Sequence, residues 1–188
     1  MSVFLSRPAG RRRSLQRKRE PIKVSEASTV KLQEPRLQDR RALLVAGLRQ
    51  HYTSETVNDI PALWRRLPFG KIRTQLGHMA YGVLFNQSDA VGGFDYLAGV
   101  EVSGVSTVLA DLTYVKIPAQ KYAIFCHRGH VSKLKDTAAA IWHEWLPASH
   151  RNVSHPAAGA PQMIEYYAEN FDPETGLGDI EVWLPLDA

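Results

Sequence analysis

The alternation of apolar and polar residues predicts an ordered series of strands and helices after a polar N-terminal stretch. An apolar run flanked by charges favours a strand over residues 40–52, and alternation favours a hairpin of two strands over residues 78–86 and 94–102. Between the first two of these, residues 53–70 carry apolar side chains at helical spacing. Pro61 within that run predicts a kink or a restart of the helix. The first half therefore has the predicted order strand, helix, strand, strand.

The second half repeats this order. An extended segment over residues 112–129 is broken at Pro118, where a strand would lose a hydrogen bond of its ladder. Residues 130–147 predict a helix that Pro147 ends, and two short strands follow it. The repeat predicts an α+β fold with a duplicated β-α-β-β unit. We expect an antiparallel sheet with two helices on one face and, on the other, a ligand cleft between the halves.

The last two predicted strands carry carboxylates beside aromatic residues. In DIEVWLPL (179–186) the aliphatic residues occupy one face, which leaves Glu181 and Trp183 on the other. In MIEYYAENF (163–171) Glu165 and Tyr167 share a face. Because the aliphatic face suits the side under the helices, we expect all four side chains to lie together on the open face.

Aromatic residues of the first predicted hairpin, Tyr81 and Tyr96 among them, alternate in the same way. A concave face with aromatic rings and a carboxylate suits flat, cationic or amphipathic molecules, since the rings offer stacking and the carboxylate supplies the counter-charge. The alternative is that the rings form core and the glutamates are solvated, and spacing leaves both open. Trp64, on the first predicted helix, either closes one end of the cleft or belongs to the core.

Charge is unevenly distributed along the 188 residues. Residues 1–28 hold eight of the 23 basic residues and two of the 19 acidic ones, so this tail carries +6 and the remainder −2. Such a composition cannot bury enough surface to offset its ordering entropy. We expect a disordered basic tail over 1–28 and one folded domain over 29–188. Weak nucleic-acid contact through the tail, or a targeting role, are open alternatives for it.

Other features narrow the class of protein. No apolar run approaches the roughly 20 residues that span a bilayer, so we expect a soluble protein with no membrane partner. Cys126 is the single cysteine, which suits a reducing cytoplasm. His127 and His130 have no closely placed carboxylate to complete a metal site, so we interpret them as loop and cap residues. No metal or cofactor is expected.

The segments YGVLFN, FDYLAGVEV, IPAQKYAIFCHRG and IEYYAENFDPETGLGDIEVWLPL together resemble the GyrI-like small-molecule-binding domain family. This domain is also the effector-binding half of AraC-type transcription regulators and occurs in multidrug-sensing activators. Residues 29–188 show no helix-turn-helix pattern, so the resemblance is to a stand-alone member. It implies the duplicated fold, with Glu165 as the pocket carboxylate that accepts cationic drugs in sensor members. It also implies that Tyr81, Tyr96 and Trp183 are aromatic walls.

Three functions stay open. The first is binding of an amphipathic, aromatic or cationic small molecule, by a drug sensor or a sequestering protein linked to transcription regulation. The second is hydrolysis of strained-ring cyclopropanoid genotoxins, which the resemblance implies for some relatives, with Glu165 as general base beside Tyr167 and Glu181. The third is a protein-interaction role such as gyrase inhibition. Convergence of Glu165 and Glu181 in one cleft favours hydrolysis, and their separation favours binding.

Overall fold

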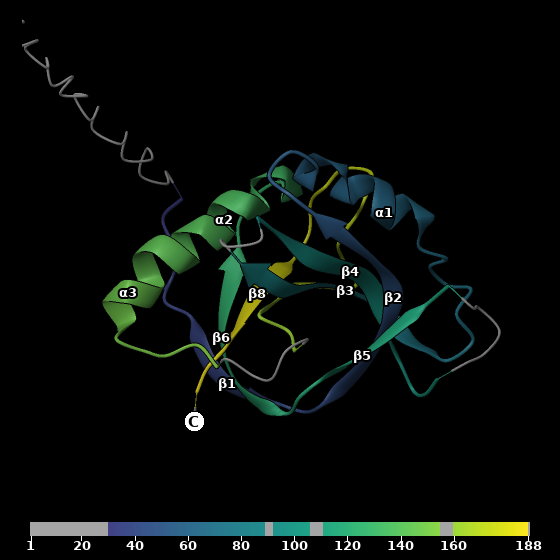
Figure 1. Cartoon of the computed structure of the whole chain (residues 1–188), viewed down its shortest axis with the longest axis horizontal. Coiled ribbons are helices and arrows are strands. Elements are labelled where there is room, and N and C mark those ends of the chain that lie inside the picture. The colour runs from purple at the N-terminus through teal and green to yellow at the C-terminus, as the bar shows by residue number, and fades with distance from the viewer. Residues whose placement is uncertain (1–29, 89–91, 106–110, 155–159, 188) are drawn as a thin grey trace, which may run out of the picture.

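The computed structural model describes residues 30–88, 92–105, 111–154 and 160–187. The predicted basic tail, residues 1–28, lies outside the described residues. Over the described part, the chain forms one antiparallel sheet with helices packed on one of its faces (Figure 1). This arrangement confirms the predicted α+β class and the position of the helices on one face.

Eight strands form the described sheet, in the order β1-β6-β8-β7-β3-β4-β2-β5. Every neighbouring pair is antiparallel. The bounds are β1 (Arg36–Arg40), β2 (Leu43–Tyr52), β3 (Gln75–Ser88), β4 (Gly93–Val102), β5 (Thr113–Ile117), β6 (Gln120–His127), β7 (Met163–Tyr167) and β8 (Ile180–Pro185).

The sheet curls because short links tie its two edges together. Only residues 41–42 join β1 to β2, and only residues 118–119 join β5 to β6. In the sheet, however, β1 lies at one edge and β2 lies next to the other edge. Each link therefore draws the two edges toward one another, and the sheet bends into a half-barrel with the ring-like outline seen in Figure 1.

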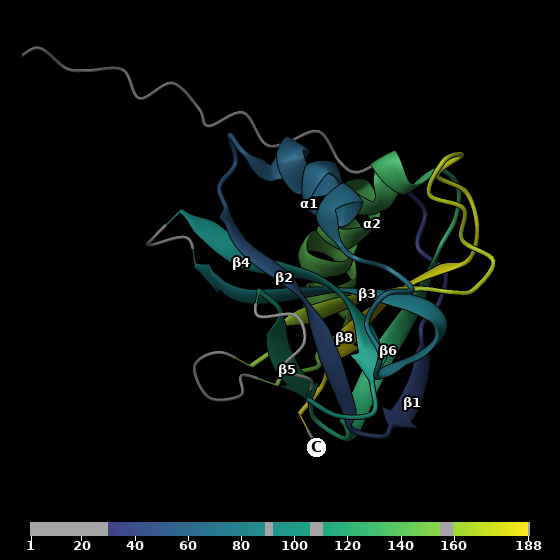
Figure 2. The same ribbon diagram turned by 90° about the vertical axis from the view of Figure 1, so that its right-hand side faces the viewer.

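Two helical regions cover the outer face of this curled sheet. Figure 2 shows α1 and α2 on the same side of the sheet, and side chains from both contribute to one apolar core. The first region restarts as α1 at Ile60, and Pro61 lies in the first turn of α1, as its fixed φ allows. The first region comprises a 3-10 turn (Val57–Asp59) and α1 (Ile60–Arg66); the second comprises a 3-10 turn (Val131–Lys133), α2 (Leu134–Ala140), a π-helical segment (Ile141–Trp145) and α3 (Leu146–Ser149).

The second helical region continues past Pro147, so the prediction that Pro147 ends the helix is wrong. Pro147 lies in the first turn of α3, directly after the π-helical segment. A proline is tolerated in a first turn because the missing N–H has no partner to lose there. The region ends instead at His150, which adopts the left-handed conformation with φ 53°.

Apolar clusters lie on both faces of the sheet. The inner core lies inside the curl and gathers side chains from β2 through β8, such as Phe85, Ile124 and Trp183. The outer core lies between the sheet and the helices, where Leu63 of α1 and Ile141 pack on the strands. Successive residues of a strand therefore point to opposite faces of the sheet. A shift of one residue in the register of a strand would move its side chains to the opposite face. The register therefore decides where the predicted site residues lie.

Candidate functional site

The register of the final hairpin separates the predicted site residues. Strands β7 and β8 pair so that Glu165 lies opposite Val182, one position away from Glu181. Directly paired residues share a face, so Glu165 and Tyr167 face the helices, whereas Glu181 and Trp183 face the inside of the curl. The prediction that all four share an open face is wrong, because Glu165 is in register with the aliphatic face of β8.

On the helix-covered face, two phenols hold Glu165. The hydroxyl of Tyr96, on β4, donates to Oε2 of Glu165 at 2.6 Å, and the hydroxyl of Tyr167 donates to the same oxygen at 2.9 Å. Among the described residues, no hydrogen bond reaches Oε1. Both tyrosines are buried, whereas Glu165 is half-buried. One carboxylate oxygen is therefore fixed, and the other is left for a further partner.

Gly82 makes room for these hydrogen bonds. It lies beside Glu165 in the pairing of β3 with β7 and beside Ala98 in the pairing of β3 with β4. A methyl group at Gly82 would overlap the hydroxyl oxygen of Tyr96 and stand 2.5 Å from Oε2 of Glu165. Gly82 is not among the predicted site residues. A glycine inside a strand nevertheless signals a close approach of this kind.

Trp64 of α1 covers this cluster. Its Nε1 donates to the hydroxyl oxygen of Tyr96 at 3.2 Å, and its ring meets that of Tyr167 edge-on with centroids 5.2 Å apart. Phe171, in the connection between β7 and β8, packs on Tyr167 with centroids 4.9 Å apart. Trp64 is partly buried against the outer core. Hydrogen bonds thus run from the indole through a phenol to the carboxylate of Glu165.

The carboxylate of Glu165 forms no ion pair with any described residue. Burial raises its pKa, and the hydrogen bonds from Tyr96 and Tyr167 offset only part of that effect. Burial, followed by the nearby charge of Glu165, raises the pKa of both phenols well above the ordinary value. The phenols therefore remain donors at neutral pH. A desolvated carboxylate without a counter-ion is unfavourable, and a cation beside it would relieve that cost.

On the inner face, Glu181 is already paired. Arg36 and Arg40 of β1 both reach its carboxylate, Arg40 at 3.4 Å, and Nε1 of Trp183 donates to Oε2 at 2.8 Å. The guanidinium carbon of Arg40 also lies 4.5 Å from the centroid of the Trp183 ring. This is a cation–π contact. The contacts predicted for a cationic ligand at Glu181 are thus made by the chain's own arginines.

Tyr81 and Trp183, predicted as walls of the cleft, pack into the inner core, where each is 3% exposed. Trp183 stacks on Tyr166 with centroids 5.3 Å apart and planes 22° apart. Tyr81 contacts these two rings at centroid distances of 6.2 and 5.5 Å. The structure therefore brings together four of the predicted residues, Glu165, Tyr96, Tyr167 and Trp64, and separates from them Glu181, Trp183 and Tyr81.

No helix of the described ranges is long and apolar enough to cross a bilayer. No three His, Cys, Asp or Glu side chains of those ranges gather as they would around a metal ion. His130 is a helix cap, as predicted, because its ring accepts from the N–H of Ser132. His127 lies in β6 and not in a loop, with Nδ1 2.8 Å from Oγ1 of Thr137.

Comparison with known proteins identifies a family. The model of the GyrI-like small molecule binding domain matches residues 33–187. A curated relative, the transcriptional regulator BrlR of Pseudomonas aeruginosa, is 28% identical over 158 residues. That match covers 80% of this chain and 54% of BrlR, so the chain spans about half the length of this relative.

Solved structures share the fold. The structure of SAV2435 bound to tetraphenylphosphonium has a TM-score of 0.60 at 20% identity, over 82% of this chain and 94% of that one. The C-terminal domain of EcmrR has a TM-score of 0.58 at 15% identity, over 83% of this chain and 98% of that one. At these identities the likeness concerns the fold, which is the curled antiparallel sheet with its helices.

Proposed function

The chain belongs to the GyrI-like small-molecule-binding domain family, and we propose that it binds an amphipathic organic cation at Glu165. One observation carries the proposal. Glu165 is desolvated, has one oxygen fixed by two phenols, and has no cationic partner among the described residues. A structural carboxylate would be paired, as Glu181 is. An unpaired one is suited to a charge that arrives with a ligand.

The surroundings of Glu165 fit a ligand that is both cationic and aromatic. Trp64, Tyr96 and Tyr167 offer ring surface for apolar contact and for cation–π attraction. A cation about 4 Å from the carboxylate at an effective dielectric constant of about 20 gains about 4 kcal/mol of Coulomb energy. Since Trp64 covers the cluster, we expect the indole to rotate away or to stack on the ligand that enters.

The relatives support the ligand class and the context. The structural neighbour SAV2435 is bound to tetraphenylphosphonium, a lipophilic cation with four aromatic rings. BrlR is a transcriptional regulator, which supports a link between ligand binding and transcription. We propose accordingly that the domain senses or sequesters such a cation in a regulatory context.

Hydrolysis of a strained ring gains no support from the arrangement of carboxylates. A two-carboxylate mechanism needs Glu165 and Glu181 in one cleft, and these residues lie on opposite faces of the sheet. Glu181 is also held by two arginines and Trp183. Binding without turnover is therefore the function that the geometry favours.

We also propose that the fold is a duplication with the ligand cleft between its halves. The two halves of the chain, β1 to β4 and β5 to β8, occupy equivalent places in the sheet. If each strand of one half is exchanged with its counterpart in the other, the strand order is unchanged when it is read from the opposite edge. Each half has a helical region after its second strand. Glu165 and Tyr167 come from the second half, whereas Tyr96 and Trp64 come from the first, so the proposed site draws on both.

Calorimetric titration with tetraphenylphosphonium tests the proposed site. Glu165→Gln keeps the shape of the side chain and removes its charge. We expect it to weaken binding by about tenfold to 100-fold, since a charged interaction is worth about 1.5–3 kcal/mol. Glu169→Gln is the matched control because Glu169 is an exposed carboxylate next to the same strand, and it should bind like the wild type. Equal affinity of Glu165→Gln, or no saturable binding by the wild type, would contradict the proposal.

A further inference from the structure

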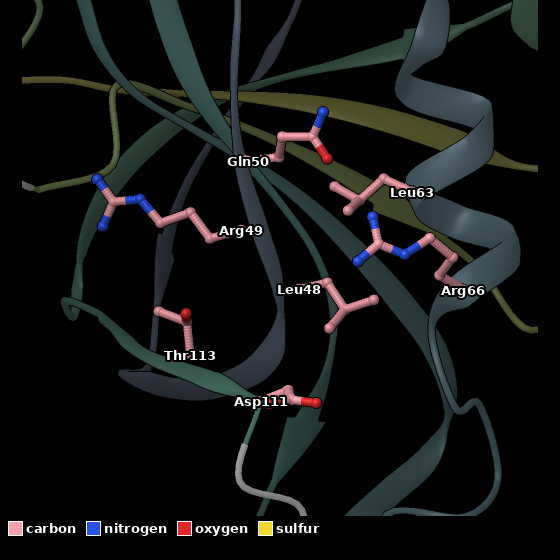
Figure 3. Close-up of a pocket in the computed structure, with 7 residues that line it drawn as sticks. All are labelled: Leu48, Arg49, Gln50, Leu63, Arg66, Asp111 and Thr113. Atoms are coloured by element: carbon pink, nitrogen blue, oxygen red, sulfur yellow. The ribbon is translucent and has the colours of Figure 1, made fainter.

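We propose that a cavity beside α1 binds a small zwitterion with an aliphatic side chain. The cavity has a volume of about 440 Å³ and lies between α1, β2 and the start of β5 (Figure 3). Ligand pockets commonly have volumes of about 300–1,000 Å³, so an amino acid fits this space. None of the residues around Glu165 lines it.

Two opposite charges of the cavity wall lack a partner in the described part of the chain. Arg66, in the last turn of α1, and Asp111, just before β5, are both exposed, and they do not pair with each other. Arg49 is different, because it donates to Asp95 at 2.7 Å and lies 4.8 Å from the centroid of Phe85. Figure 3 shows Arg49 extending away from Arg66. The cavity therefore presents one available cation and one available anion.

The rest of the lining is apolar or neutral. Leu63 of α1 is buried and Leu48 of β2 is half-buried, and together they give the cavity an apolar surface. Gln50 and Thr113 add a neutral amide and a hydroxyl. An aliphatic side chain would cover the two leucines and be shielded from water there.

This combination of charges selects the class of ligand. A guanidinium binds a carboxylate through two parallel hydrogen bonds, so Arg66 would take the carboxylate of the zwitterion. Asp111 would accept from its ammonium group. A simple organic anion would meet the charge of Asp111, and a simple cation that of Arg66, so each is disfavoured relative to the zwitterion.

The helix α1 keeps this cavity separate from the proposed cation site. Leu63 and Trp64 are consecutive, yet Leu63 lines the cavity, whereas Trp64 contacts Tyr96 and Tyr167. A zwitterion in the cavity and a cation at Glu165 would therefore contact different residues of α1. The two proposals rest on different residues, and each can fail without the other.

Titration of the full chain with L-leucine, followed by amide chemical shifts in NMR, tests the cavity. We expect saturable shifts in β2, α1 and the start of β5. L-Leucinamide, which lacks the carboxylate, and 4-methylpentanoate, which lacks the ammonium group, should each bind at least about tenfold more weakly. No saturable shift with L-leucine, or equal affinity for either analogue, would overturn the proposal.

Surface variants assign the binding to the cavity. Arg66→Gln and Asp111→Asn should each weaken L-leucine binding by about tenfold, and because both residues are exposed, the fold should persist. Arg65→Gln is the matched control, since Arg65 is its exposed neighbour on α1 and does not line the cavity. Glu165→Gln should bind L-leucine like the wild type. If Arg66→Gln binds as tightly as Arg65→Gln, the cavity is not the site.

Discussion

Glu165 and Glu181 lie in the two strands of one hairpin, close in the sheet and opposite in their surroundings. Glu181 faces the inside of the curl, where two arginines and an indole N–H satisfy its carboxylate. Glu165 faces the helices, where neutral phenols bind one of its oxygens and the other has no hydrogen bond from the described residues. Both carboxylates lie among aromatic rings, so composition alone does not separate them.

The difference between the two carboxylates indicates that the two faces of the sheet have different roles. On the inner face, Trp183, Arg40 and Glu181 each have a partner from the chain itself. The outer face leaves a desolvated charge under a single partly buried indole. Sites that bind ligands commonly retain groups that destabilise the empty protein. The inner face should therefore determine stability, and the outer face should determine binding.

The largest expected effect on stability separates a tryptophan of the inner face from one that covers the outer face. Trp183→Ala removes a ring that is 3% exposed and stacked on Tyr166, so it should lower the free energy of unfolding by about 3–5 kcal/mol. Trp64→Ala removes a partly buried ring and one hydrogen bond, and it should cost less than about half as much. Urea unfolding followed by circular dichroism measures both. Equal losses would show that the two faces are not divided in this way.

A smaller effect is expected when Glu181 loses its charge. Glu181→Gln keeps an acceptor for the indole of Trp183 but leaves Arg36 and Arg40 without their counter-ion. The free energy of unfolding should fall by about 1–2 kcal/mol, since hydrogen bonds to charged groups contribute about 1.5–3 kcal/mol and Arg36 is largely exposed.

Glu169→Gln provides the baseline for this measurement. Glu169 is exposed, and its substitution should leave the unfolding midpoint in urea unchanged. At a temperature where it is folded, Glu181→Gln should bind tetraphenylphosphonium with the affinity of the wild type. A loss of binding without a loss of stability would place Glu181 in the site and reverse the assignment of the faces.

Most of the fold can be predicted from the spacing of apolar residues and the positions of prolines in the sequence. The alternation in residues 78–86 and 94–102 predicts β3 and β4, and Pro118 divides β5 from β6. Strand β1 is not predicted in this way, because its residues are almost all exposed and show little alternation of apolar and polar side chains. It is held by its pairing with β6 and by the ion pairs of Arg36 and Arg40 to Glu181, which are contacts distant in sequence.

The site was only half predictable for a related reason. Alternation correctly joins Glu165 to Tyr167 and Glu181 to Trp183, because each pair lies within one strand. It cannot say which pair faces the helices, since that depends on the register between two strands. A register shift of one residue exchanges the faces. The aliphatic neighbours of Glu181 predict the open face for both pairs, whereas the observed register places Glu165 opposite Val182.

The smallest expected effect has the opposite sign. Glu165→Gln keeps an oxygen for Tyr96 and Tyr167 and removes an unpaired, desolvated charge. At neutral pH and without ligand, we expect the variant to be more stable than the wild type by about 0.5–1 kcal/mol, as is common when a functional site is relieved of strain. A clear loss of stability would indicate that the ionised carboxylate is itself a structural partner.

The expected difference in stability between Glu165→Gln and the wild type depends on pH. Burial raises the pKa of Glu165 in the folded state above its ordinary value, and the hydrogen bonds from Tyr96 and Tyr167 offset only part of the rise. The folded state therefore binds a proton more readily than the unfolded state, and stability falls as the pH rises through the folded-state pKa. The advantage of Glu165→Gln should accordingly be largest at neutral pH and should disappear as the pH approaches the ordinary carboxyl pKa of about 4.3. Urea unfolding of both proteins between these limits measures it, and an advantage that grows toward acid pH would mean that Glu165 is stabilised as the anion.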